Sequence, residues 1–175
     1  MEDKTMTHFL SLAGFATGLT LTLAPALSAQ DDTNAEAEAI ARTYMDHYSA
    51  VDWDAMEAML AADMVFSDTT AQGESYGPDG IQEDGRDAMM ATLREFGERY
   101  HPIELGFEWD DVFASNSRVV FIGHVNALYP TQSEGQVFRW RSRQVSVITV
   151  RDGQVVAHQD FANYAAPEQG LIAAD

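Results

Sequence analysis

Hydrophobic residues in the first half of the chain recur at helical spacing in three segments. A capping box at residues 33–36 precedes apolar positions three to four residues apart, which predicts a first helix that ends near Val51. Residues 52–54 can cap a second, short helix over 55–63. A third helix is predicted over 85–100, where one side carries Met89, Leu93, Phe96 and Tyr100.

Alternation of apolar and polar residues predicts strands elsewhere in the chain. A short strand over 63–70 is followed by a glycine-rich segment, 71–85, which is long for a simple connection and is therefore a candidate lid. Four further strands, with a hairpin turn at Asp152-Gly153, are predicted over 103–113, 118–129, 137–150 and 153–164. This order predicts an α+β fold in which three N-terminal helices pack on one face of a curved, mostly antiparallel sheet.

The first residues have the pattern of a targeting segment. An uncharged apolar run over 9–26 is followed by small residues and then by acids, which is typical of a secretory signal peptide cleaved near Ser28 or Ala29. An uncleaved N-terminal anchor and a cytosolic chain are the alternatives. We expect residues 1–29 to be a signal peptide, residues 30–175 to form one domain, and the mature protein to be periplasmic or secreted without integral membrane association.

The composition is that of an acidic globular protein. The chain has 28 acidic and 10 basic residues and a net charge of −18, which becomes −17 if Glu2, Asp3 and Lys4 leave with the signal peptide. Such a surface repels phosphate backbones, so we expect no nucleic-acid partner. The chain contains no cysteine, so its core must form without disulfides.

Several polar residues are predicted to lie among apolar ones on the same strand faces. Side chains two residues apart on a strand share a face. This grouping selects Asp68, His124, Asn126, His158 and Asp160. Their apolar neighbours on those faces include Phe66, Ile122 and Val156. Because buried ionisable groups are costly unless they are paired, the pattern predicts a polar-lined pocket between sheet and helices.

Each of these residues also has a plainer interpretation. A strand histidine is often a satisfied core or edge residue, and Asp68 and Asp160 can bond to nearby backbone at strand ends. Trp53, Trp109 and Trp140 can be core residues instead of a ligand platform. A metal site made by His124, His158 and Asp160 is a further alternative, but no ligand spacing supports it, so no metal is predicted.

Three stretches of the sequence resemble the nuclear transport factor 2-like superfamily, especially its SnoaL-like branch. They are YMDHYSAVDWDAMEAMLAADMVFSD, the GRDAM that opens the third predicted helix, and the closing DGQVVAHQDFANY. The resemblance covers residues 35–164. It implies a cone-shaped α+β fold that hosts isomerases, hydrolases, dehydratases, cyclases and proteins without known activity, and it implies no cofactor.

The resemblance also implies roles for single residues. In limonene epoxide hydrolases the catalytic aspartate of the closing strand corresponds to Asp160, the central Arg-x-Asp corresponds to His124 and Asn126, and the water-holding Tyr and Asn correspond to Phe66 and Asp68. In ketosteroid isomerases the proton-shuttling aspartate corresponds to Asp68. SnoaL-type cyclases and scytalone dehydratase are similar in a broader sense, because both combine His and Asp for proton transfer.

The first functional hypothesis is a cofactor-independent exported enzyme that moves protons on a small, largely apolar organic substrate, as an isomerase, dehydratase, cyclase or hydrolase. In it Asp160 orients or activates His124, Asp68 is the second acid/base group, and Asn126 holds a substrate oxygen. The cavity wall and rim are predicted to include Tyr48, Phe66, Trp109, Trp140 and His158.

The second hypothesis is a non-catalytic periplasmic domain that binds a small ligand or forms a homodimer through its exposed sheet face. Arg139, Arg141 and Arg143 point to that face by alternation. They can pair with the acids of a partner or remain solvated.

Overall fold

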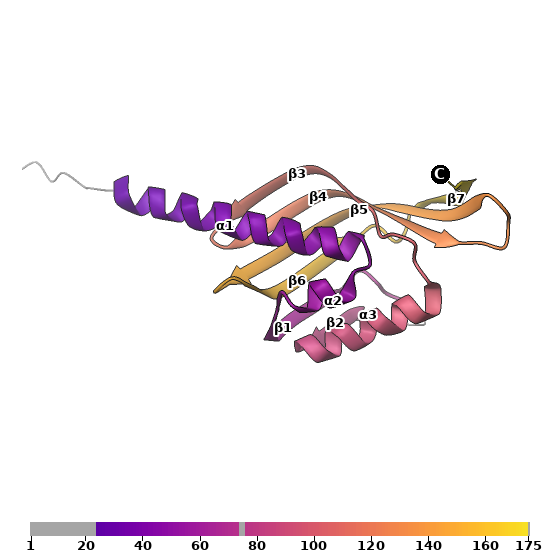
Figure 1. Cartoon of the computed structure of the whole chain (residues 1–175), viewed down its shortest axis with the longest axis horizontal. Coiled ribbons are helices and arrows are strands. Elements are labelled where there is room, and N and C mark those ends of the chain that lie inside the picture. The colour runs from indigo at the N-terminus through magenta and orange to yellow at the C-terminus, as the bar shows by residue number, and fades with distance from the viewer. Residues whose placement is uncertain (1–23, 74–75, 175) are drawn as a thin grey trace, which may run out of the picture.

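A seven-stranded sheet with helices packed against it organises the described part of the chain, as Figure 1 shows. The computed structural model describes residues 24–73 and 76–174, with side chains from residue 31 onward. The helices are α1 (Ala24–Ser49), α2 (Trp53–Glu57) and α3 (Arg86–Tyr100). The strands are β1 (Leu60–Asp68), β2 (Ile81–Asp84), β3 (Phe107–Ser115), β4 (Arg118–Pro130), β5 (Gln136–Arg151), β6 (Gln154–Ala162) and β7 (Glu168–Ala173). The predicted α+β class, with helices on a mostly antiparallel sheet, is confirmed.

The strand order across the sheet is β2-β1-β6-β5-β4-β3, with β7 added beside β5. All neighbouring strands are antiparallel except β1 and β6, which run parallel. In that parallel pair Asp68 lies opposite Asp160, and Phe66 lies opposite His158. The pairing therefore brings two carboxylates from distant parts of the sequence to adjacent positions on one face of the sheet.

Strand β5 changes its neighbour along its length. Residues 144–151 pair with β6, whereas residues 136–141 pair with β7. The long β4–β5 hairpin thus continues past the end of β6 and extends beyond α3 (Figure 1). This extension supplies one wall of a hollow whose other walls are β1, β2 and α3.

The core lies between the sheet and the helices. Helix α1 crosses β3, β4 and β5 and buries Tyr44 and Met45, which are at most 2% exposed (Figure 1). Helix α3 packs on β1 through its buried residues Met89, Met90 and Leu93. The inward residues of the central strands include Val119, Phe121 and Ile148, each 0% exposed. Burial of these faces is the main source of stability in a chain without disulfides.

Helix α1 begins earlier than the capping box predicted. It runs without interruption from Ala24, so residues 33–36 lie inside the helix instead of at its start. The preceding helical turn supplies the backbone acceptors that a cap would otherwise replace. The predicted signal peptide falls mostly on residues 1–23, which lie outside the described residues, while residues 24–29 form the beginning of α1. No helix in the described ranges is both long and apolar enough to cross a membrane.

Two other boundaries and two further strands differ from the sequence prediction because strand pairing decides them. The second helix ends at Glu57, although Asp52 caps it as predicted by accepting from the Ala55 amide at 3.2 Å. Strand β1 starts at Leu60, where the chain pairs with Val155 of β6. The predicted loop 71–85 contains β2, an edge strand paired with β1, and β7 was not predicted at all. Both missed strands are short and lie where long-range pairing, rather than alternation, fixes the structure.

The close approach of β3 and β4 at Gly123 gives a test of the sheet. Strand β3 has a register shift between Trp109 and Asp111, and a methyl group at Gly123 would meet the Glu108 carbonyl oxygen and lie 2.8 Å from the Trp109 Cα atom. We expect Gly123→Ala to lower the free energy of unfolding by about 2–3 kcal/mol, measured by urea denaturation. Gly170→Ala on β7 is the control, because nothing lies within 4 Å of its added methyl, and it should change stability by less than about 0.5 kcal/mol. Equal losses in the two variants would contradict this account.

Candidate functional site

A cavity of about 960 Å³ opens between the β4–β5 hairpin, strands β1 and β2, and helix α3. This volume is at the upper end of the range for small-molecule sites, roughly 300–1,000 Å³. Ten of the chain's 18 aromatic residues line it, although they come from every part of the domain. Five are tyrosines, namely Tyr48, Tyr76, Tyr100, Tyr129 and Tyr164. The others are Phe66, Phe96, Phe107, Phe138 and Trp140. Such a wall favours a largely apolar, ring-containing ligand.

Asp160 is the buried carboxylate at the polar end of this cavity. Its Oδ1 atom accepts from Gln144 Nε2 at 3.0 Å and from the Ser146 hydroxyl at 2.5 Å, and it lies 2.9 Å from His158 Nε2. Gln144 Nε2 also donates to Ser146 Oγ at 2.9 Å, which orients that hydroxyl toward Asp160. The Oδ2 atom has no hydrogen-bond partner among the described residues, and Asp160 lines the cavity. One oxygen is therefore held by protein donors while the other is available to a ligand.

A histidine and a tyrosine support Asp160 from the core. His158 is 0% exposed, and the Tyr44 hydroxyl lies 2.8 Å from its Nδ1 atom. Because Nε2 faces a carboxylate, we assign the neutral tautomer with the proton on Nε2, so that Tyr44 donates to Nδ1 and Nε2 donates to Asp160. The rings of Tyr48 and Phe66 meet the imidazole edge to face, which leaves it little freedom to turn. The chain Tyr44–His158–Asp160 thus runs from α1 to the cavity.

Asp68, directly opposite Asp160, accepts hydrogen bonds from the protein on both of its carboxylate oxygens. Its Oδ1 accepts from the Thr70 amide, the Thr70 hydroxyl and the Ala71 amide at 2.6–3.0 Å. Its Oδ2 accepts from the Tyr164 hydroxyl at 2.6 Å. The Tyr164 ring is 44% exposed, but its hydroxyl is turned inward, and burial together with the charge and hydrogen bond of Asp68 raises its pKa well above the usual value. Asp68 therefore anchors the ends of β1 and β6, and Tyr164 stays protonated.

Tyr48 presents a free hydroxyl in the same region. It is 8% exposed, lines the cavity and makes no hydrogen bond through its hydroxyl to any described residue. Burial, and then the negative charge of Asp160, raises the pKa of Tyr48 well above its usual value, so the phenol remains a donor. A ligand oxygen in the cavity can accept a hydrogen bond from the Tyr48 hydroxyl while another ligand atom contacts Asp160.

A sequence model described as the SnoaL-like domain matches residues 41–158, which is more than half of the chain. The chain belongs to the SnoaL-like domain family. Among curated proteins none matches the chain.

Solved structures agree with this fold. A proposed SnoaL-like polyketide cyclase from Shewanella putrefaciens is 19% identical, with a TM-score of 0.60 over 74% of this chain and 90% of that one. An epoxide hydrolase of Mycobacterium tuberculosis, similar to limonene epoxide hydrolase, is 15% identical, with a TM-score of 0.58 over 75% and 86%. A proposed ketosteroid isomerase from Kribbella flavida is 20% identical, with a TM-score of 0.54 over 76% and 82%. Similarity at this level of identity establishes the fold of the SnoaL-like domain and not its reaction.

The structure brings five of the residues predicted from the sequence to the cavity of the SnoaL-like domain: Tyr48, Phe66, Asp68, Trp140 and Asp160. His158 lies behind Asp160 and does not reach the cavity surface. Trp109 was expected in the cavity wall but packs in the core, with its ring 5.0 Å from that of Phe107 and 5.1 Å from that of Phe121.

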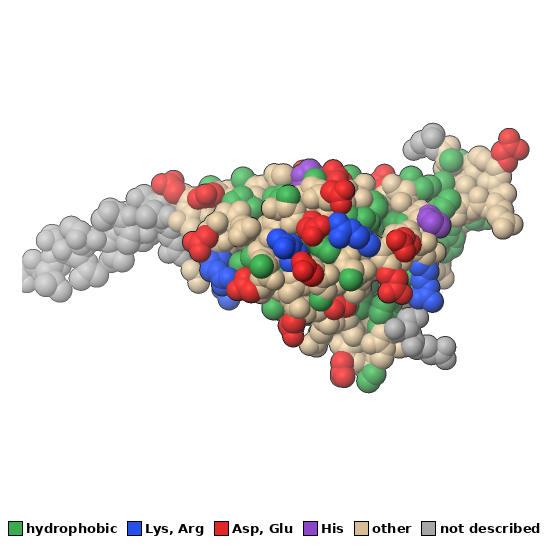
Figure 2. All heavy atoms as spheres, turned by 60° about the horizontal axis from the view of Figure 1, so that its bottom comes forward, with side chains coloured by type: hydrophobic (Ala, Val, Ile, Leu, Met, Phe, Trp, Pro, Cys, Tyr) green, Lys and Arg blue, Asp and Glu red, His purple; other side chains and the backbone are tan. Residues whose placement is uncertain are grey.

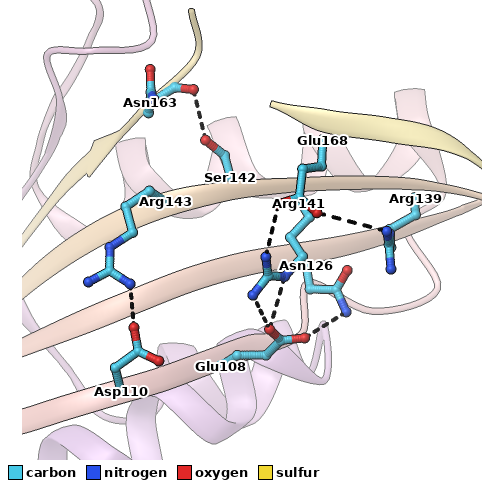
Figure 3. Close-up of polar contacts among 9 residues, drawn as sticks. All are labelled: Glu108, Asp110, Asn126, Arg139, Arg141, Ser142, Arg143, Asn163 and Glu168. Carbon is cyan, nitrogen blue, oxygen red and sulfur yellow. Dashed lines mark hydrogen bonds and ion pairs between the residues drawn. The ribbon is translucent and has the colours of Figure 1, made fainter. Parts of the chain in front are cut away.

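His124 and Asn126 do not join this group, because they lie on the opposite face of the sheet. Their neighbours Val125 and Ala127 line the cavity, so alternation turns His124 and Asn126 outward. Figure 3 shows Asn126 on that outer face, where its Nδ2 atom donates to Glu108 at 3.1 Å. The predicted Asp160–His124 pair is therefore wrong in geometry, and the metal site considered with His158 is not assembled either.

The arginine stripe of this outer face is paired within the chain, as Figure 3 shows. Arg141 donates to Glu108 at 2.8 Å and to Glu168 at 3.4 Å, and Arg143 pairs with Asp110. Arg139 lies 4.0 Å from Glu168. These side chains tie β5 to β3 and β7, so their pairing with the acids of a partner protein is not needed to explain them.

Two features of β4 and β6 explain why some of their residues were predicted to lie on the wrong face of the sheet. Both alternating sets on β4 are apolar enough to be buried, and the inward set is Val119, Phe121, Gly123, Val125 and Ala127. On β6, a register shift beside Val156 turns Val155 inward instead, while His158 and Asp160 keep the inward face. Periodicity alone could not choose between the faces of β4 or locate the shift.

Four members of the site were not found by sequence reasoning: Tyr44, Gln144, Ser146 and Tyr164. The signal for two of them exists, because Ser142, Gln144 and Ser146 alternate in phase with Trp140 and Ile148 on the inward face of β5. Polar residues inserted in series into an apolar strand face indicate an internal partner, which here is Asp160. Tyr164 is the last residue of the final predicted strand, and only the tertiary structure brings it to Asp68.

Tyr129 at the mouth of the cavity gives a pH test of this environment. Burial raises its pKa to about 12, whereas tyrosine in an unfolded chain titrates near about 10. Its contribution to stability is thus complete below about pH 10 and is lost as the pH rises toward about 12. We expect the free energy of unfolding in urea to fall between about pH 10 and 12, and to fall less in Tyr129→Phe. An identical decrease in both proteins would show that Tyr129 is not held in a protonated, buried state.

Proposed function

We propose that the SnoaL-like domain is an exported, cofactor-independent enzyme that transfers protons on a small, largely apolar organic substrate, with Asp160 as its acid/base group. The observation that carries the proposal is the difference between the two oxygens of Asp160. Oδ1 is bonded by Gln144, Ser146 and His158, whereas Oδ2 has no partner among the described residues and lies beside the cavity. Export is supported by the apolar run over 9–26.

The geometry supports a simple proton cycle. Oδ2 of Asp160 takes a proton from a substrate C–H or O–H group, and the Tyr48 hydroxyl donates to the substrate oxygen on which negative charge develops. The proton then returns from Oδ2 to another substrate atom, which gives isomerisation, or to a leaving oxygen, which gives elimination. His158 and Tyr44 act as positioning residues, because they hold Oδ1 without touching the substrate.

Asp68 has a different role in this scheme from the one expected for it. With four protein donors on its carboxylate it positions Tyr164 and the end of β1, and neither of its oxygens is without a protein donor. An epoxide-hydrolase mechanism that uses the central Arg-x-Asp is disfavoured, because those positions are His124 and Asn126 on the outer face. A single-base proton transfer fits the residues that remain.

Replacing the proposed base without changing its shape tests catalysis. We expect Asp160→Asn to remain folded, since the amide oxygen can still accept from Ser146 and Gln144, but to lose at least about a hundredfold in rate. The assay is incorporation of solvent deuterium into a panel of apolar ketones, followed by NMR. Asp111→Asn on β3 is the control, because it removes the same charge from an exposed position. Exchange in the wild type that survives in Asp160→Asn removes Asp160 from the mechanism, and no exchange or turnover with any substrate class favours a binding function.

A second proposal concerns assembly, namely a homodimer formed through the outer face of the sheet. Phe113 and Phe161 on this face are 46% and 41% exposed. They are joined across the strands by Val120, Ile122 and Val145, because Phe113 pairs with Val120, and Val145 pairs with both Ile122 and Phe161. If two subunits are related by a twofold axis through this apolar patch, the patch of each subunit packs against that of the other, and both are buried.

The dimer proposal predicts that a charge in the patch separates the subunits. Phe161→Lys should convert the protein from dimer to monomer in sedimentation velocity. Leu171→Lys should leave the dimer intact, because Leu171 is 54% exposed but pairs with the cavity residue Phe138 and so lies on the other face. A wild-type protein that sediments as a monomer would rule the proposal out.

A further inference from the structure

The groups that line the cavity carry unequal charges. Among the described lining residues four are acidic, Asp68, Glu83, Glu95 and Asp160, and one, Arg99, is basic. The chain as a whole shows the same imbalance, since its net charge is −18, and Figure 2 shows acidic side chains spread more widely than basic ones over the face it presents. The potential inside a low-dielectric cleft lined mostly by one sign of charge favours ligands of the opposite sign.

Asp160 is the acid that most requires a positive partner. It is 5% exposed, its Oδ2 atom is unpartnered among the described residues, and no lysine or arginine lies within ion-pair distance of it there. A buried carboxylate without a counter-charge is costly. An alkylammonium ligand supplies both the charge and the N–H donor that Oδ2 lacks.

The rings around Asp160 are suited to the same kind of ligand. Tyr48, Phe66, Trp140 and Tyr164 line the cavity together with it. The faces of aromatic rings attract cations, and the attraction grows when water is excluded. Carboxylate and aromatic rings together form the combination that binds ammonium groups, while the apolar wall accepts a hydrocarbon body.

We infer that the cavity binds apolar amines in their protonated form, with the ammonium group donating to Oδ2 of Asp160. The inference rests on the same open Oδ2 atom of Asp160 as the proposed function, but it does not require that the protein catalyse a reaction. In an enzyme of the proposed kind, the ammonium N–H group lies at Oδ2, where the substrate C–H or O–H group would otherwise lie. The amine therefore competes with substrate. Arg99 opposes this preference from the rim, where its guanidinium lies 5.7 Å from the Tyr100 ring and forms no ion pair with a described residue.

Three probes of nearly equal shape test the preference for charge. Naphthylmethylamine is a cation at neutral pH, naphthylmethanol is neutral, and naphthoate is an anion. Titration calorimetry with the full mature chain should show the amine binding at least about tenfold more tightly than the alcohol, which corresponds to about 1.4 kcal/mol, and naphthoate binding most weakly. Equal affinities for amine and alcohol overturn the inference.

Matched variants locate the preference at Asp160. Asp160→Asn should abolish the tenfold advantage of the amine over naphthylmethanol, whereas Asp111→Asn, which removes the same charge on β3, should leave that advantage unchanged. Arg99→Gln should strengthen amine binding. An amine advantage that persists in Asp160→Asn, or that falls equally in both Asn variants, assigns it to the general acidity of the chain and overturns the proposed contact.

The outcome is separate from that of the proton-transfer assay. An amine preference without deuterium exchange supports the inferred amine binding and contradicts the proposed enzymatic activity. Deuterium exchange without an amine preference supports Asp160 as a base and contradicts the inferred binding of protonated amines.

Discussion

The burial of the Asp160 carboxylate is the constraint on which the site depends. A carboxylate that is 5% exposed needs several donors, and the fold supplies them from two strands and a helix. Gln144 and Ser146 come from β5, His158 comes from β6, and Tyr44 of α1 holds the far side of the imidazole. All of these partners act on one oxygen, directly or through His158, so the second oxygen is left for the cavity. The packing of α1 across the sheet is thereby linked to the chemistry at its centre.

The parallel pair of β1 and β6 gives this arrangement its second carboxylate. Asp68 and Asp160 are neighbours across the pair, yet their surroundings differ. Asp68 is bonded by the turn that follows β1 and by Tyr164, and Thr70 also accepts from the Ala162 amide, which fastens the ends of both strands. Two carboxylates on one sheet face thus differ in their bonding: both oxygens of Asp68 accept from protein donors, whereas Asp160 keeps one oxygen open to the cavity.

Catalysis and binding draw on the same features of the cavity. An open carboxylate oxygen, a free phenol at Tyr48 and walls of aromatic rings can move a proton on a neutral substrate or hold an ammonium ion. Structures with this architecture are named as cyclase, isomerase and epoxide hydrolase, so the fold by itself does not select one function. The function of this SnoaL-like domain therefore rests on the partners of a few side chains.

The sequence by itself determined the types and order of most elements, and hence the α+β class, because periodicities of 3.6 and 2 report which side of an element is apolar. It also identified Asp68 and Asp160, since each lies on a strand that has one apolar, buried face, and each stands among the apolar residues of that face. Tertiary structure alone decided the inward face of β4, because both of its faces are apolar, and so it excluded His124 and Asn126. Only pairing between distant strands could place β2 and β7, bring Tyr164 to Asp68, and leave one oxygen of Asp160 open. Local patterns carry no information about which strand becomes the neighbour of another, and the site is made of such neighbours.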